Sequence, residues 1–286
     1  MATLKQIRRR IRSIQSTMQI TKAMEMVAAA KLRRAQSRSL AARPYVNAMQ
    51  ASLARVAAAA PPDAHPLLTP RVVKPELERE LFIVIASDKG LCGSFNTHIL
   101  SQAERRLDGM DRERVRFVAV GRRAVRYFQY RHRPMWRAIE RLGDQLDFDL
   151  VRELARLSID AFTSGEVDRV EVLHHRFITT ARRETLLDRL IPVVGVETEK
   201  HPRQYIFEPD AATVLATLLP RFVTTRLLSM IADSLAAEHS ARMLAMGNAT
   251  RNAQDMIGSL TLKANKLRQA TITRELIDIV GGSVTE

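Results

Sequence analysis

Apolar side chains recur every three or four residues at the start of the chain. Residues 2–43 contain neither proline nor glycine, and the spacing is that of a coiled-coil seam, whose first members are Leu4, Ile7, Ile11, Ile14 and Met18. Beyond this point the apolar stripe runs into alanine-rich sequence that favours helix to about Ala60. The pattern predicts one long helix, with Pro44 as the position where a break is allowed.

A second long helix is predicted at the other end. No proline follows Pro220, and residues 222–280 keep apolar positions at helical spacing. Small residues recur along this stretch and permit close approach of a partner helix, at some cost in helix propensity. Gly281 and Gly282 predict the end of the helix. The two terminal helices are therefore able to pair.

Short apolar runs alternate with amphipathic helices between the termini, which predicts an α/β unit. The expected strands are residues 81–86, 115–120, 170–178 and 186–194, and the expected helices are residues 96–107, 121–130 and 147–164. The fold class is therefore α/β, with a central Rossmann-like domain and long terminal helices. We divide the chain into an N-terminal helix (1–60), a proline-rich linker (61–75), an α/β domain (76–208) and a C-terminal helix (209–286).

Charge is concentrated at one end of the molecule. The 286 residues carry a formal charge of +14, and residues 1–60 supply +11 of it, with 12 basic residues against the single acidic residue Glu25. Such a surplus calls for an anionic partner. A single cysteine, Cys92, rules out an internal disulfide framework and a Cys-based structural zinc site. With no secretion signal and no stretch approaching about 18 uncharged apolar residues, we expect a soluble or peripheral protein.

The loop of residues 87–96 follows the first buried strand and precedes a helix, which is where α/β proteins bind phosphates. Its spacing fits neither common glycine-rich phosphate motif. We therefore favour a tight turn, in which Gly90 and Gly93 let the backbone leave the sheet, over a nucleotide site.

Two other groups of residues are candidates for chemical sites. Cys92 could act as a nucleophile with His174 or His175 as base, but its apolar neighbours favour a packed thiol, and adjacent residues of a strand face opposite ways. Carboxylates cluster before the helix predicted at 147, and capping of that helix explains them; they are Asp144, Asp147 and Asp149. No spacing of metal ligands is present, and no cofactor is expected.

The basic N-terminal helix leaves two classes of partner open. Nucleic acid would suit its arginine density. However, residues 1–60 contain one aromatic residue, Tyr45, so a stacking platform for single strands is missing, and the apolar seam predicts a helix as neighbour.

Three separated motifs resemble the gamma subunit of F-type ATP synthases, and the resemblance follows the whole chain in order and length. The first runs from Ile7-Arg8-Arg9-Arg10-Ile11 through Ile20-Thr21-Lys22-Ala23-Met24-Glu25-Met26. The second is Ser87-Asp88-Lys89-Gly90-Leu91-Cys92-Gly93 with Phe95-Asn96. The third is Asn265-Lys266-Leu267-Arg268-Gln269-Ala270 followed by Ile272-Thr273-Arg274-Glu275-Leu276.

The resemblance implies a non-catalytic rotor. In that family the terminal helices form an antiparallel coiled coil inside a hexamer of three alpha and three beta subunits, and the α/β domain meets the epsilon subunit and the c-ring. One copy per complex is implied, peripheral to the membrane, at the cytoplasmic face of a bacterial plasma membrane; a mature mitochondrial chain would look alike. Nucleic acid is not a partner on this hypothesis, and a basic coiled-coil nucleic-acid-binding protein is the alternative.

The resemblance also implies contact residues. The positions that match the family's contacts with the alpha and beta hexamer are Lys22, Met24, Arg242, Arg268, Gln269, Thr273 and Glu275. Lys22 and Met24 correspond to positions near an acidic loop of beta, which suits the positive charge of the N-terminal helix. Thr273 and Glu275 could instead serve only to stabilise the coiled coil.

Overall fold

The computed structural model describes residues 3–61, 64–74, 77–193, 207–208 and 210–283, without the side chains of residues 38–43, 275 and 278–283. Its elements in chain order are α1 (Leu4–Ala59), the 3₁₀ turn η1 (Pro66–Leu68), β1 (Glu80–Ile85), α2 (Phe95–Asp108), β2 (Val115–Val120), α3 (Arg122–Tyr130), β3 (Arg137–Ile139), α4 (Phe148–Thr163), β4 (Arg169–Phe177), β5 (Arg183–Ile191) and α5 (Ala211–Ser283).

The chain separates into two compact units, each of which takes part of both long helices. One unit comprises residues 1–29 and 242–286, and the other comprises residues 30–241. The second unit holds the sheet, which has the strand order β3-β2-β1-β4-β5. Strands β1 to β4 are parallel, and β5 returns antiparallel beside β4. Between β1 and β4 the chain order reverses, as in doubly wound α/β folds.

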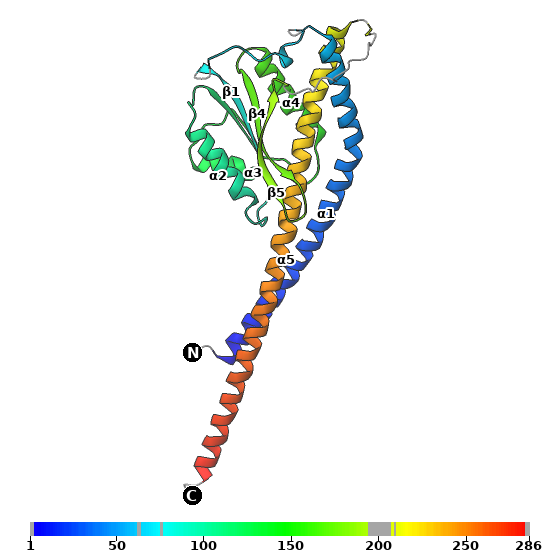
Figure 1. Cartoon of the computed structure of the whole chain (residues 1–286). Coiled ribbons are helices and arrows are strands. Elements are labelled where there is room, and N and C mark those ends of the chain that lie inside the picture. Colours follow the sequence, from blue (N-terminus) through cyan, green and yellow to red (C-terminus); the bar gives the residue numbers. More distant parts are fainter. Residues whose placement is uncertain (1–2, 62–63, 75–76, 194–206, 209, 284–286) are drawn as a thin grey trace. The chain divides into compact units, whose positions relative to one another are not determined.

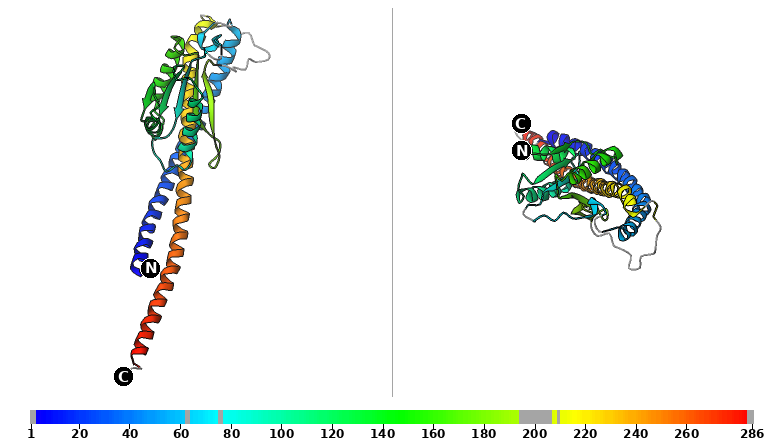
Figure 2. Two further views of the ribbon diagram at one scale, coloured as in Figure 1. Left: turned by 90° about the vertical axis from the view of Figure 1, so that its left-hand side faces the viewer. Right: turned by 90° about the horizontal axis from the view of Figure 1, so that it is seen from above.

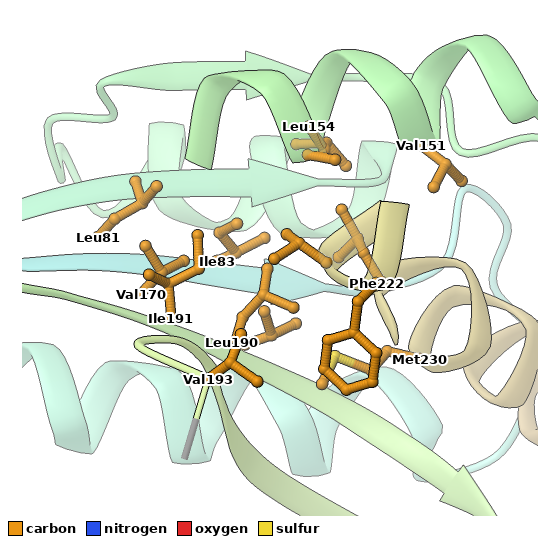
Figure 3. Close-up of a cluster of buried hydrophobic side chains, with 14 of the residues drawn as sticks. Leu81, Ile83, Val151, Leu154, Val170, Leu190, Ile191, Val193, Phe222 and Met230 are labelled. Carbon is orange, nitrogen blue, oxygen red and sulfur yellow. The ribbon is translucent and has the colours of Figure 1, made fainter. Parts of the chain in front are cut away.

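Both faces of the sheet are covered. On one face, Phe82 and Val84 of β1 pack with apolar residues of α2 and α3. On the other face, Leu81 and Ile83 join α4 and the parts of α1 and α5 that belong to this unit. The second cluster is the larger, and its side chains interdigitate between the strands and α4 (Figure 3). A sheet buried on both faces explains why β1 is apolar at nearly every position.

The predicted order of strands and helices is confirmed, since each of the four expected strands and three expected central helices is present within three residues of its expected ends. Two elements were not predicted. They are the turn η1, which lies inside the proposed linker, and the three-residue edge strand β3. The doubly wound sheet and the two long helices confirm the predicted fold class.

Helix α1 is one long helix, as predicted, and the break that Pro44 would allow does not occur. Helix α5 begins at Ala211, near the boundary expected at 209, and therefore runs through Pro220 rather than starting after it. Packing outweighs the lost hydrogen bond at Pro220, because Leu215 and Leu219, in the turns before it, are fully buried. Similarly, helix α1 has buried residues on both sides of Pro44, at Leu32 and Met49. The described part of α5 extends to Ser283, one residue beyond the end predicted at Gly281 and Gly282.

In the smaller unit, the beginning of α1 and the later part of α5 lie side by side (Figures 1 and 2). Ile7 and Ala28 of α1, and Ala253 and Ala264 of α5, are among its buried apolar residues. A pair of hydroxyls joins the helices, with 2.8 Å between the Oγ1 atoms of Thr21 and Thr250. The two helices of this unit are therefore paired, with Ile7 of the predicted seam buried between them.

The expectation that no segment is apolar enough to span a membrane needs a correction. One window of 18 residues within Ala211–Arg274 of α5 has a mean hydropathy of 1.4 and at most two charged residues, so this helix is long and apolar enough to cross a membrane. The test uses length and composition alone, and core helices of water-soluble proteins also pass it. Here 44% of the window is buried inside the protein.

Candidate functional site

The loop between β1 and α2 lies at the carboxyl end of β1, beside the point where the strand order reverses. In doubly wound proteins a ligand binds in the crevice at this point, and the helix N-terminus that follows supplies backbone N–H groups. The sequence motif of residues 87–96 falls here, so the loop is the first place to look for a ligand site.

The carboxylate of Asp88 already takes the place of an anion in this loop. It accepts hydrogen bonds from the backbone N–H groups of Arg122, at the start of α3, and of Leu142 and Gly143, at distances of 3.1, 3.1 and 2.9 Å. These are the kind of donors that would otherwise bind a phosphate. The arrangement favours a structural loop, as the sequence predicted, and ties three segments of the chain together.

Ser87 and Asn96 hold the two ends of the loop. The side-chain oxygen of Asn96 accepts from the Ser87 N–H at 3.1 Å and from its hydroxyl at 2.9 Å. Gly93 has φ of +57°, which fits its predicted role in the turn. Gly90 acts differently, because a Cβ there would lie 2.2 Å from a guanidinium nitrogen of Arg123. A side chain at this position would therefore have to displace the end of the Arg123 side chain.

Helix α5 packs against one side of the loop. Cys92 and Phe95 are each 1% exposed and pack against Ala237 and Ala241 of α5. The small side chains of the two alanines allow the helix to come close to the loop. This side of the loop is thus covered by the chain's own helix, while a hollow of about 470 Å³, lined among others by Gly90, Asn96 and Arg123, lies on the side of α2 and α3.

The candidate thiol and imidazoles have structural partners. The Sγ atom of Cys92 accepts from Nδ2 of Asn96 at 3.2 Å. The two imidazoles bond to different neighbours: Nε2 of His175 lies 3.0 Å from the carbonyl oxygen of Phe95, and Nε2 of His174 lies 3.1 Å from the carboxylate of Asp188. Burial lowers the pKa of His175 to about 4, so the imidazole is neutral at pH 7. The hydrogen bond from His174 lowers the pKa of Asp188.

The three clustered aspartates have different roles. Asp147 is the N-cap of α4 and accepts from the N–H groups of Asp149 and Leu150, as predicted. Asp149 forms an exposed ion pair with Arg152. Capping does not explain Asp144, because its carboxylate bridges Lys31 of α1 and Lys89 of the β1–α2 loop, at 2.9 and 2.8 Å. Its hydrogen bonds with Lys89 and then Lys31 lower the pKa of Asp144 to about 2.

The residues carried over from the family lie on the helices of the smaller unit. Lys22 is exposed and pairs with Glu25 at 3.2 Å, and Met24 is half-buried. On α5, Arg242 is buried. Three further residues are exposed, namely Arg268, Gln269 and Thr273, and the side chain of Glu275 lies outside the described residues.

Exposed apolar residues accompany these positions. On α5 the side chains of Leu262, Ile272, Leu276 and Ile277 are between 48% and 65% exposed. The last buried residue of the described part of α5 is Ala264, and beyond it the described side chains are exposed apart from half-buried Leu267. An apolar surface of this kind suits a protein partner.

Sequence reasoning missed Asp88, the hydroxyl pair of Thr21 and Thr250, and the bridge from Asp144 to Lys31. Asp88 lies in the second motif, but nothing in the local sequence shows that its carboxylate accepts from N–H groups more than 30 residues away. The other two contacts join residues 229 and 113 positions apart (250 − 21 and 144 − 31). Only the fold brings them together.

These features define a class: α/β proteins in which a doubly wound sheet packs against two long terminal helices that also pair with each other. Solved structures of this class are similar over most of the chain. One is a Euglena gracilis mitochondrial ATP synthase, with a TM-score of 0.69 and 16% identity, covering 99% of this chain and 94% of that one. Another is the central stalk and c-ring of the Tetrahymena thermophila mitochondrial ATP synthase, with a TM-score of 0.60, 22% identity, and coverage of 80% and 99%.

The sequence relationship is more specific. Residues 3–285 match the family described as ATP synthase. The chain is 42% identical to the ATP synthase gamma chain of Desulforamulus reducens and 40% identical to that of Pelotomaculum thermopropionicum, with 99% of both chains covered in each case. The chain therefore belongs to the family of ATP synthase gamma chains, as the three sequence motifs predicted.

Proposed function

We propose that this chain is the central-stalk rotor subunit of an F-type, proton-translocating ATP synthase. Rotation of the c-ring turns the chain, and the chain drives the three catalytic beta subunits through their conformations in turn; ATP hydrolysis turns it in the opposite direction. The observation that carries the proposal is family membership over the whole length of the chain, joined to a pair of long helices with an exposed end.

The smaller unit supplies a surface suited to a surrounding ring of subunits. Its α5 segment extends beyond its last described buried residue, Ala264, and carries exposed Leu262, Ile272 and Leu276. Its α1 segment carries exposed basic side chains at Arg8 and Arg9. Because these features differ around the helix pair, each beta subunit meets a different side as the pair turns. One bistable interface, repeated three times, is then biased by the side that faces it.

The proposed contacts are those that the family resemblance implies, and exposure and charge support them. Exposed Lys22, with half-buried Met24 nearby, meets an acidic loop of beta, which suits the surplus positive charge of α1. Arg268 and Gln269 meet a second beta loop, and Thr273 and Glu275 support the same face. Arg242 is buried, so its part in the contact is to support the helix surface rather than to reach a partner alone.

The proposal gives the chain no catalytic step. The burial and bonding of Cys92 support this, as does the Asp88 carboxylate in the place of a phosphate. The partners would be three alpha and three beta subunits, an epsilon subunit and the c-ring, with one copy of this chain per complex. The site of action would be the cytoplasmic face of a bacterial plasma membrane. This reading is preferred to nucleic-acid binding, because the relatives at about 40% identity are ATP synthase gamma chains.

Assembly tests the proposal first. Tagged full-length chain, isolated from its own membranes, is expected to bring alpha and beta subunits with ATPase activity, whereas a chain ending at Pro220 loses them because it lacks most of α5. Recovery of the chain with nucleic acid, and without alpha and beta, would overturn the rotor function.

Coupling tests the contact residues. In the assembled complex, the double substitution Arg268→Ala and Gln269→Ala is expected to reduce ATP-driven proton pumping per ATP hydrolysed. The matched control is Arg251→Ala with Asn252→Ala, two exposed neighbours on the same helix. An equal pumping ratio in the two double variants would count against the contact at Arg268 and Gln269.

A further inference from the structure

The carboxylate of Asp144 joins three segments that are distant in the chain. One oxygen, Oδ2, lies 2.9 Å from Nζ of Lys31 on α1 and 2.8 Å from Nζ of Lys89 in the loop after β1. Asp144 itself belongs to the segment between β3 and α4. The bridge therefore fastens α1 to two loops at the carboxyl end of the sheet.

Helix α5 is fastened beside this bridge. Nε2 of His239 lies 3.4 Å from the backbone oxygen of Asp144, and the hydroxyl of Ser240 donates to the backbone oxygen of Thr180, in the turn between β4 and β5. We call the five side chains Lys31, Lys89, Asp144, His239 and Ser240 the collar. The collar holds both long helices to loops of the sheet.

Apolar packing is interrupted at the same level. A cavity of about 170 Å³ lies here, lined by Lys31 and Arg34 of α1, by Leu235 and His239 of α5, and by Asp144 and its neighbours. Side chains that line a water-accessible hollow make fewer contacts with one another than side chains in a close-packed core do. Ionic and hydrogen-bonded contacts therefore carry more of the attachment of α1 here than they do in the closely packed cluster around Leu53 and Leu154.

The position of the collar in the chain gives it a mechanical meaning. Residues 30–241 form one compact unit, so Lys31 is the second residue of that unit on α1, and Ser240 is the last but one on α5. The opposite ends of the two helix segments, Ala59 of α1 and Ala211 of α5, connect to the rest of the unit. The collar thus anchors each helix near the residue at which the helix leaves the unit.

We propose that the collar is the contact through which torque passes between the α/β unit and the two long helices, with Asp144 as its positioning residue. The inference rests on the rotor function proposed above. Without the bridge, α1 would be held by packing farther along the unit, and a longer stretch of helix would be free to twist. The bridge therefore sets torsional stiffness, while the chemistry of ATP remains on other subunits.

Angular fluctuations in a single rotating complex measure this stiffness. Alpha and beta subunits assembled with the full chain are fixed to a surface, and a bead is attached through Tyr130→Cys in a Cys92→Ser background, because Tyr130 is 83% exposed on α3. With Asp144→Ala, the variance of the bead angle during each pause is expected to rise roughly twofold, because one of two parallel helix anchors is lost. The rate of ATP hydrolysis is expected to stay unchanged.

Matched variants separate this role from a general loss of structure. Asp149→Ala removes an exposed carboxylate that pairs within its own helix, and it should leave the variance unchanged. Asp144→Glu keeps the carboxylate and should restore most of the stiffness. Lys31→Met removes the bridge from the α1 side and should raise the variance as Asp144→Ala does. It also serves as the test variant if Asp144→Ala does not assemble.

The outcomes distinguish the two proposals. A wild-type chain that does not assemble or rotate with alpha and beta would overturn the rotor function, and the collar's role with it. A rotating complex in which Lys31→Met or Asp144→Ala has the same angular variance as Asp149→Ala would overturn the collar alone. A larger variance of the bead angle in Asp144→Ala and Lys31→Met, with a value near wild type in Asp144→Glu, would establish the role of the collar.

Discussion

Replacing Asp88 by alanine tests the assignment of its loop as structural. Its carboxylate accepts three backbone N–H groups, from Arg122, Leu142 and Gly143. The bonds to Leu142 and Gly143 are partly buried, and the residue Leu142 is 2% exposed. The bond to the N–H of Arg122 is exposed, so water can replace the carboxylate there.

The expected loss follows from the two partly buried donors. A hydrogen bond to a charged group contributes about 1.5–3 kcal/mol net, so losing two lowers the free energy of unfolding by about 3–6 kcal/mol. Water entering the space left by the side chain offsets part of this, and we expect about 3 kcal/mol. In a domain of about 200 residues, this corresponds to a fall of roughly 6–12 °C in melting temperature.

Thermal and urea unfolding of the full chain, followed by circular dichroism, measure this change. Asp160→Ala is the control, since that exposed aspartate pairs only with the exposed Arg156 one turn away and should change stability by about 0.5 kcal/mol or less. Asp88→Asn keeps one oxygen acceptor and should fall between the two. If Asp88→Ala melts with the control, then the carboxylate does not hold the loop, and its place would be open to an anion.

Two further predictions concern buried groups of the same unit. Burial holds the pKa of His175 at about 4, below its ordinary 6.5, so between these pH values the unfolded chain binds a proton that the folded chain does not. The contribution of this group to the free energy of unfolding is therefore complete above pH 6.5 and falls by about 3 kcal/mol toward pH 4. Urea unfolding at pH 7 and pH 4.5 should show a smaller loss of stability in His175→Gln than in wild type. Equal losses in the two proteins would refute the neutral, buried state of His175. Cys92→Ser should keep the hydrogen bond from Asn96 and lower the free energy of unfolding by about 1 kcal/mol, measured by thermal unfolding. Coupled proton pumping should stay intact. An assembled Cys92→Ser complex without activity would instead indicate a reactive thiol.

The sequence predicted the fold well where periodicity was long or burial was continuous. The apolar run of β1 and the seam of α1 are such cases, and both elements are present. Pro220 is less well predicted, because local rules count a lost hydrogen bond but not the packing of flanking turns, such as those of Leu215 and Leu219. Strand β3, at the edge of the sheet beside β2, has only three residues, which is too short for an alternating pattern to appear in the sequence.

The candidate loop was predicted in position but not in content. Its motif indicated a turn after a buried strand, which is correct. The groups that contact the loop come from far along the chain: the N–H groups of Leu142 and Gly143, and the side chains of Ala237 and Ala241. Asp144 shows the same limit, since a carboxylate near a helix start predicts a cap, and only the fold brings Lys31 within 2.9 Å.

The pairing of the first helix with the last has a consequence for synthesis of the chain. The partner of Thr21 is Thr250, 229 residues later, so α1 waits on the ribosome while the whole sheet is made. At about 5–20 residues per second this delay is on the order of 10–45 s, far longer than a helix or hairpin needs to form. The strands from Glu80 to Ile191 are complete before α5 begins, so the sheet can fold first. During that interval the seam around Ile7 is uncovered, and the nascent chain is most open to capture by chaperones or to misassociation with a neighbour.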